Sequence, residues 1–226
     1  MIEQRIGTKI LSAIPSSFCR TTRFPPMVEF SIGRCQIRLH FLFLAALVIV
    51  LFTDLRAFTL ISIAAAVIHE GGHLLMMVLC GIPPKSVMIH AFGVVICEQT
   101  QVALSRHREV LISLAGPAAN GIAAGISLLC HRWIPVESFV LANGALGLFN
   151  LLPVDSLDGG RALWIWLSPV MEPSALSRLL TGLSLLCILP MATLGFWTLL
   201  TSPWNFSLLL VSVYLMLCLV LKERGE

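Results

Sequence analysis

The sequence predicts an all-α polytopic membrane protein with about six transmembrane helices and a short β-hairpin or re-entrant loop after the second. Composition carries most of this prediction, because 57% of the 226 residues are hydrophobic, only 12% are charged, and the mean hydropathy is +0.91. Soluble domains have about 25% charged residues. A surface that faces water on all sides cannot be built from half that supply, so the outside of this fold must face lipid. The length fits one membrane domain.

Six apolar stretches set the number of helices, since each is long enough, or nearly so, to cross about 30 Å of hydrocarbon. The first and fourth are the shortest. Asp54 and Arg56 make the only polar break between the first and the second, which predicts a tight helical hairpin there. In chain order the stretches are Leu39–Thr53, Phe58–Cys80, Val110–Cys130, Phe139–Pro153, Leu179–Leu200 and Trp204–Leu221.

Basic residues indicate the orientation of these spans. Residues 1–40 contain six basic and two acidic side chains, and the positive-inside rule places such a segment in the cytoplasm. The expected outer loops hold only Arg56 and Arg132. We therefore expect a multi-pass protein of the bacterial cytoplasmic membrane with both termini cytoplasmic. Its parts would be an N-terminal arm over residues 1–36, a membrane domain over 37–222 and a tail over 223–226.

The N-terminal arm has mixed polarity, no clear periodicity and no signal-peptide pattern with a cleavage site. Residues 1–26 form either a short cytoplasmic arm or a stretch upstream of a translation start at Met27, and we favour the second. Because the basic arm leads straight into an apolar span, it indicates membrane topology, and we expect no nucleic-acid partner. The seven cysteines include no CxxC pair, so we expect neither disulfides nor a cysteine metal site.

The inner segment 84–100 is rich in β-branched residues around Ala91-Phe92-Gly93. This composition is typical of a short hairpin or re-entrant loop. A plain connecting loop fits the sequence equally well.

The sequence HEGGH at residues 69–73, inside the second span, carries the strongest chemical signal. Positions i and i+4 share one face of a helix, so the His69 and His73 imidazoles can hold one metal ion. Zinc accepts such nitrogens and keeps an open position in catalytic sites. Glu70 can then serve as the general base towards the water that zinc activates. The alternative is a pair of core histidines beside a paired glutamate, but three ionisable groups in an apolar span usually mark function.

A third zinc ligand is expected where the fourth span breaks. Pro153 and Gly159-Gly160 interrupt the helix, and irregular backbone at membrane depth is tolerated only against protein or a wet cavity. The same stretch contains Asp155 and Asp158. Asp158, directly before the two glycines, is the preferred ligand, and Asp155 is the alternative.

HEGGH in an early span, followed by N-x-x-P-x-x-x-x-D-G-G in a later one, resembles the site-2 protease family of intramembrane zinc metalloproteases. The compact arrangement is most similar to the branch of the stage IV sporulation protease. The resemblance implies that Asp158 is the third ligand of one Zn²⁺ per chain. It also implies that the chain cuts membrane-tethered protein substrates in regulated intramembrane proteolysis, with the bilayer and regulatory membrane proteins as further partners.

A further match is the sequence AGPAANG at residues 115–121, in the third span. By resemblance, Asn120 approaches the active site and orients the substrate backbone. Helix packing through small residues is the alternative interpretation of this stretch.

Two other functions use the same residues. A zinc transporter would need the ligands but not Glu70 beside them. A catalytically inactive membrane scaffold would not need the full set, and the presence of His69, Glu70, His73 and Asp158 argues against it.

Overall fold

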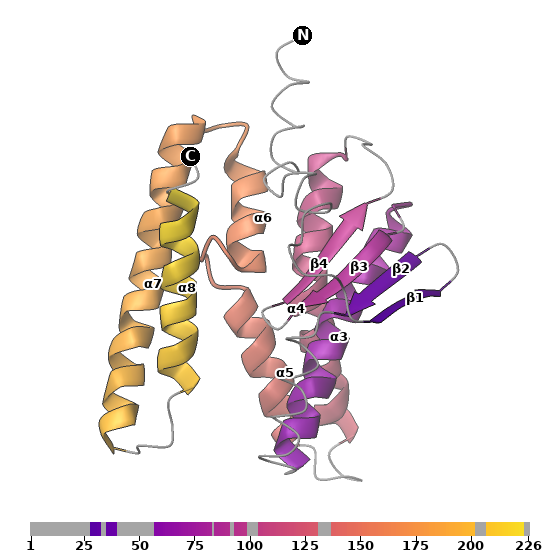
Figure 1. The fold of residues 1–226 in the computed structure, drawn as a ribbon, viewed down its shortest axis with the longest axis horizontal. Coiled ribbons are helices and arrows are strands. Elements are labelled where there is room, and N and C mark those ends of the chain that lie inside the picture. Colours follow the sequence, from indigo (N-terminus) through magenta and orange to yellow (C-terminus); the bar gives the residue numbers. More distant parts are fainter. Residues whose placement is uncertain are drawn as a thin grey trace.

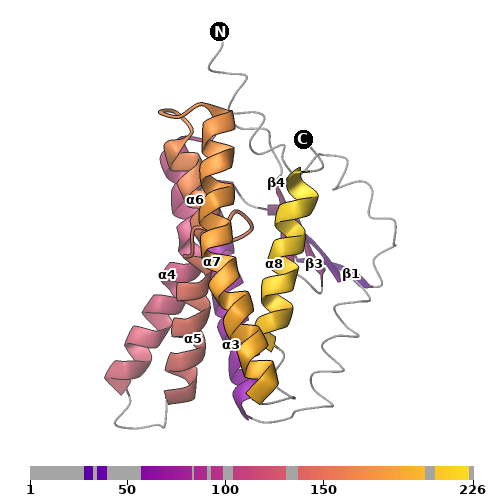
Figure 2. The ribbon, with the colours of Figure 1, turned by 90° about the vertical axis from the view of Figure 1, so that its left-hand side faces the viewer.

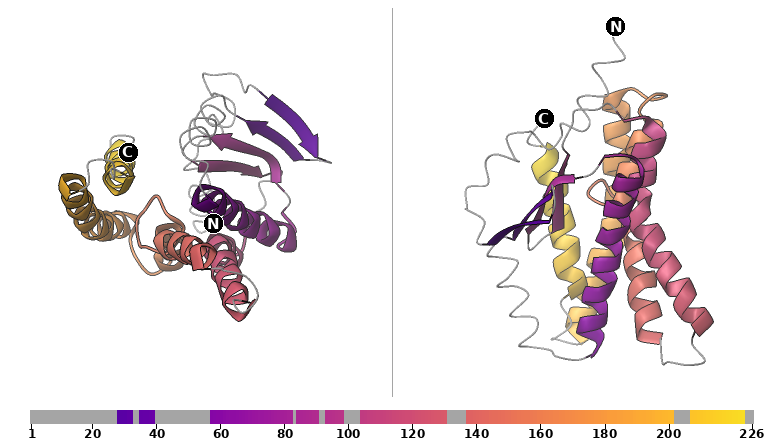
Figure 3. Two further views of the ribbon diagram at one scale, coloured as in Figure 1. Left: turned by 90° about the horizontal axis from the view of Figure 1, so that it is seen from below. Right: turned by 90° about the vertical axis from the view of Figure 1, so that its right-hand side faces the viewer.

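The computed structural model describes residues 28–32, 35–39, 57–82, 84–90, 93–98, 104–130, 137–201 and 207–223. Helices standing side by side form most of this part of the chain, and a small sheet lies beside α3, on the side away from α4 (Figures 1, 2 and 3). The elements are β1 (Val28–Ile32), β2 (Cys35–Leu39), α3 (Ala57–Leu79), β3 (Pro84–His90), β4 (Gly93–Glu98), α4 (Arg106–Cys130), α5 (Glu137–Asn150), α6 (Asp158–Leu167), α7 (Pro173–Thr201) and α8 (Ser207–Glu223).

Three of these helices are long and apolar enough to cross a membrane, namely α3 over Thr59–Leu79, α4 and α7. Their outward sides are covered with exposed large apolar side chains, such as Leu75 at 62% and Leu129 at 85% exposure. Apolar surfaces of this extent would make so small a protein aggregate in water, whereas helices that face lipid need apolar side chains on their outer sides. The chain is therefore an integral membrane protein.

The expected total of six spans stays a prediction. The first expected span, Leu39–Thr53, lies almost wholly outside the described residues. Helix α5 has 14 residues and the apolar part of α8 is Leu208–Leu221, both shorter than a full crossing. Helix α7 begins at Pro173, six residues before the expected Leu179.

A four-stranded sheet corrects the expectation of an all-α fold. Its order is β1-β2-β3-β4, with β1 antiparallel to β2, β2 parallel to β3, and β3 antiparallel to β4. Residues 28–32 and 35–39 are strands, so the expected boundary after residue 36 falls inside β2. The physical reason is strict alternation of apolar and polar residues in VEFSI and CQIRL, which is the two-residue period of a strand.

Small residues bring the helices around the site close together. A Cβ added at Gly72 of α3 would lie 2.6 Å from the Ala115 carbonyl oxygen and 2.7 Å from Ala119 Cβ, both on α4. A Cβ added at Gly147 of α5 would lie 3.2 Å from Asn120 Cβ. Close approach through glycine is a common way to pack transmembrane helices, because van der Waals contact replaces the missing hydrophobic drive.

None of the six expected spans includes helix α6. In Figure 1, α6 stands above α5, and the loop 151–157 separates the two. Gly159 and Gly160 begin α6 so close to the backbone of Leu151 and Val154 that no Cβ would fit at either glycine. Two glycines therefore allow the chain to fold back tightly, and this turn places Asp158 at the first position of α6.

Candidate metal centre

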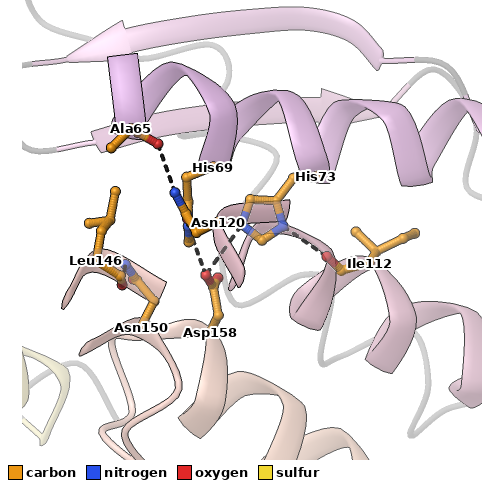
Figure 4. Close-up of polar contacts among 8 residues, drawn as sticks. All are labelled: Ala65, His69, His73, Ile112, Asn120, Leu146, Asn150 and Asp158. Atoms are coloured by element: carbon orange, nitrogen blue, oxygen red, sulfur yellow. Dashed lines mark hydrogen bonds and ion pairs between the residues drawn. The ribbon is translucent and has the colours of Figure 1, made fainter. Parts of the chain in front are cut away.

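Three ligand atoms from two distant parts of the chain converge on one point (Figure 4). His69 and His73 lie on one face of α3, one turn apart, and Asp158 faces them from the start of α6. Asp158 Oδ2 lies 3.0 Å from His69 Nε2 and 3.2 Å from His73 Nε2, and the two Nε2 atoms are 3.2 Å apart. His69 is buried and Asp158 is mostly buried. The expected ligands thus lie together in space.

The tautomer of His73 follows from its outer contact. His73 Nδ1 lies 2.8 Å from the carbonyl oxygen of Ile112 on α4. A carbonyl oxygen only accepts hydrogen bonds, so Nδ1 carries the proton and donates it. In the neutral ring, Nε2 then holds a lone pair directed at the other two ligand atoms.

His69 has the same arrangement, with a side chain in place of a carbonyl. Its Nδ1 donates to Asn120 Oδ1 at 2.6 Å, and Asn120 Nδ2 donates to the Ala65 carbonyl oxygen at 3.0 Å. Because the amide nitrogen of Asn120 faces a carbonyl, its oxygen faces His69. The neutral His69 ring is therefore also protonated on Nδ1, with a lone pair on Nε2.

These residues fit a zinc ion. Two lone-pair nitrogens and a carboxylate oxygen repel one another at 3.0–3.2 Å unless a cation or an extra proton lies between them. Tetrahedral zinc, with ligands at about 2.0–2.1 Å, requires ligand atoms about 3.3–3.4 Å apart, close to the observed separations. Histidine ligands whose outer nitrogen donates to a carbonyl or amide oxygen are the usual supporting arrangement around metals.

Gly116 of α4 keeps the space beside the ligands open. A Cβ added there would lie 2.8 Å from His69 Nε2 and 2.7 Å from His73 Cε1, and closer still to His73 Nε2. The missing side chain would occupy the region next to both nitrogens, where a bound ion must lie. Beside the convergence of the ligand atoms and the protonation of both histidines on Nδ1, this open space is a third, independent observation in favour of a metal centre.

Glu70 lies beside the centre without belonging to the ligand group. It follows His69 on α3, is partly buried, and interacts electrostatically with His73, His69 and Asp158. Among the described residues, no lysine or arginine forms an ion pair with Glu70 or Asp158. With no lysine or arginine partner in the described part of the chain, these two carboxylates add negative charge to the site, which favours a divalent cation.

Asp155, the alternative ligand, is not part of the group of His69, His73 and Asp158. Its backbone N–H donates to Ser184 Oγ of α7 at 3.0 Å. Of the two aspartates left open by the sequence, the geometry favours Asp158.

The expected substrate contact of Asn120 receives no support from its surroundings. Asn120 has no exposed surface, and its oxygen and amide group are all engaged by His69, Ala65 and Asn143. The structure favours a role in which Asn120 holds the His69 ring through its Nδ1. Sequence reasoning missed Asn143, although a polar asparagine inside an apolar stretch is a recognisable signal.

Comparison with known proteins gives two matches. The chain superposes on the solved Site-2 Protease from Methanocaldococcus jannaschii with a TM-score of 0.62 and 22% identity, covering 86% of this chain and 94% of that one. A Synechocystis sp. protein named "putative zinc metalloprotease" is 30% identical over 112 residues, which are 46% of this chain. The match spans 29% of that relative's length. No protein-family model matches the sequence. These findings support the resemblance to the site-2 protease family, and the structural match shows that the chain has the site-2 protease fold.

Proposed function

We propose that this protein is an intramembrane zinc endopeptidase of the site-2 protease family. The observation that carries the proposal is the convergence of His69 Nε2, His73 Nε2 and Asp158 Oδ2 within an apolar helix bundle, with Glu70 beside them. The names of the two similar proteins point in the same direction. We further propose that the substrates are membrane-tethered proteins, as in regulated intramembrane proteolysis, and that the membrane is the bacterial cytoplasmic membrane.

His69, His73 and Asp158 would hold the ion, which supplies Lewis-acid polarisation of a peptide carbonyl and activation of a water molecule. Glu70 would accept a proton from the attacking water at its carboxylate and pass it to the leaving amine. Asn120 and the Ile112 carbonyl hold the two imidazole rings by their outer nitrogens. Partial burial of Asp158 and burial of His69 limit the entry of water, which strengthens electrostatic interactions in the site.

Substrate would bind as an extended strand along the edge of the sheet. In the described sheet, β4 pairs only with β3, so its other side is an edge. A peptide that adds to such an edge forms main-chain hydrogen bonds independent of its sequence. A helical substrate must unwind first, because helix hydrogen bonds shield its carbonyl groups.

The Glu70→Gln variant tests this function. It should retain zinc and lose cleavage by about 10²-fold or more, the usual scale for loss of a general base. Zinc content of the purified protein and cleavage of co-expressed membrane-tethered proteins are the two measurements. Glu172→Gln, at an exposed position just before α7, is the matched control and should change neither.

The two alternatives predict other results. A zinc transporter would give metal binding without cleavage in the unaltered protein, and a zinc flux into proteoliposomes that Glu70→Gln does not abolish. An inactive scaffold would show neither cleavage nor flux. Cleavage by the Glu70→Gln variant at the original rate would exclude the mechanism proposed here.

A further inference from the structure

A buried pair of asparagines lies behind His69. Asn120 of α4 and Asn143 of α5 have no exposed surface, and Asn120 Nδ2 donates to Asn143 Oδ1 at 2.9 Å. Asn143 Nδ2 in turn donates to the carbonyl oxygen of Phe139, one turn earlier on α5, at 2.9 Å. A carbonyl oxygen only accepts, so this last bond sets which end of the Asn143 amide faces Asn120.

The order of donors and acceptors is therefore set step by step from α5 to the metal centre. Asn143 presents its oxygen, so Asn120 must present its NH₂ group. The second hydrogen of that group goes to the Ala65 carbonyl of α3. Only the Asn120 oxygen remains for His69, which must then donate from Nδ1. Reversing either amide would place acceptor against acceptor at a carbonyl.

The helices are packed to allow this connection. Gly147, one turn after Asn143 on α5, lies against α4, and a Cβ there would meet Asn120 Cβ at 3.2 Å and the Pro117 carbonyl oxygen at 3.3 Å. Both distances are shorter than ordinary contact, so a side chain at Gly147 would separate the helices by a few tenths of an ångström. The close approach keeps the bond between the two asparagines short.

We propose that Asn143 is a positioning residue of the metal centre, which acts through Asn120 to hold His69 in the tautomer whose Nε2 lone pair faces Asp158. The inference rests on the proposed zinc function. His73 obtains the same tautomer from one rigid backbone carbonyl, that of Ile112. An asparagine side chain can rotate, and two donated hydrogen bonds from one NH₂ group fix both its plane and its direction. Asn143 supplies the second of these acceptors.

The test compares Asn143→Leu with Asn143→Asp. Leucine fills the space but offers no acceptor. An aspartic acid kept neutral by burial can accept from Asn120 with one oxygen and donate to Phe139 with the other. Cobalt is the probe, because its visible spectrum reports the ligand geometry and chelator competition gives its affinity. Asn143→Leu should lower cobalt affinity by about tenfold and shift the spectrum, whereas Asn143→Asp should recover most of the affinity.

Ser127→Ala is the control, because Ser127 lies on α4, the helix of Asn120, and its hydroxyl donates to the Ala123 carbonyl one turn back on its own helix. It should leave cobalt affinity and spectrum unchanged. Equal losses in Asn143→Leu and Ser127→Ala, or no recovery with Asn143→Asp, would overturn the proposal. If Asn143→Leu does not fold, Gly147→Ala should weaken cobalt binding by about threefold. Gly144→Ala, where a Cβ meets nothing within 4 Å, should not.

A second readout needs no metal. In protein labelled with ¹⁵N-histidine, the His69 signal, identified by its loss in His69→Gln, should show the Nδ1–H tautomer in the metal-free state. Asn143→Leu should shift this signal towards a mixture of tautomers, and an unchanged signal would overturn the inference. Absence of cobalt binding by the unaltered protein would instead refute the proposed function, so the two failures are distinguishable.

Discussion

Gly116→Ala is the sharpest probe of the metal centre, because it adds one methyl group to a neighbouring helix and replaces none of the three ligand residues. Gly116 belongs to α4, whereas the histidines belong to α3 and Asp158 to α6. The added Cβ would point between the two Nε2 atoms, at 2.8 Å from that of His69. The variant therefore tests whether α4 forms a wall of the site.

The size of the effect follows from the distances. Ordinary van der Waals contact begins near 3.4 Å, so His69 and α4 must separate by about 0.6 Å, and His73 by more. Zinc sites tolerate deviations of only about 0.2 Å in ligand distance. We expect zinc affinity to fall by about 10²-fold or more, which corresponds to roughly 2.7 kcal/mol.

The assay is zinc affinity by chelator competition in detergent, with circular dichroism to confirm that the helices are retained. Gly125→Ala, nine residues further along α4, is the matched control, because a Cβ there meets nothing within 4 Å. It should bind zinc as the unaltered protein does. Equal zinc affinity in Gly116→Ala and Gly125→Ala would refute the placement of α4 against the ligands.

Three further predictions concern ligands, metal and topology. Asp158→Ala should reduce zinc affinity by at least about 10²-fold and Asp155→Ala should not, as measured by metal analysis; the reverse result would exchange their roles. Chelation should lower the unfolding temperature of the unaltered protein but not of Asp158→Ala, since a ligand at 100 times its Kd adds about 2.7 kcal/mol of stability. Reporter fusions after Glu226 and near His131 should report opposite sides of the membrane, and agreement between them would contradict the six-span topology.

The metal motif could be predicted from sequence because its geometry is local. A helix places residues four apart on one face whatever the rest of the fold does, so His69 and His73 required only that residues 57–79 be helical. Asp158 is 89 residues from His69, and it was found through the broken helix around it and a family resemblance. The choice between Asp158 and Asp155 needed the turn at Gly159-Gly160, which depends on tertiary packing.

The sheet, unlike the metal motif, could not be predicted from local sequence. The two-residue alternation of residues 28–39 was readable, but the apolar run that follows it favoured interpretation as the approach to a span. The parallel pairing of Gln36 with Ser86 joins strands separated by a whole helix, and no local pattern encodes it. The bond between Asn120 and Asn143 joins two helices in the same way, so only the structure could show that the pair lies behind His69.

The loop that carries Asp158 has its own anchor, and Ser184→Ala tests how much the site depends on it. Ser184 of α7 has no exposed surface, and its Oγ accepts the backbone N–H of Asp155 at 3.0 Å. Next to it, Val154 packs against Ile188 and Leu215, so α7 and α8 hold the loop in place. Alanine would leave the partly buried N–H without its acceptor, at a cost of about 1 kcal/mol in the free energy of unfolding.

A looser loop should weaken zinc binding by several-fold, because Asp158 is the ligand that the loop positions. Ser212→Ala on α8 is the matched control, since Ser212 is 1% exposed and its hydroxyl donates to the Leu209 carbonyl of its own helix. Its zinc affinity should match that of the unaltered protein. The measurement is zinc affinity alongside chemical unfolding. If Ser184→Ala lost stability but kept full affinity, the turn at Gly159-Gly160 alone would be enough to position Asp158.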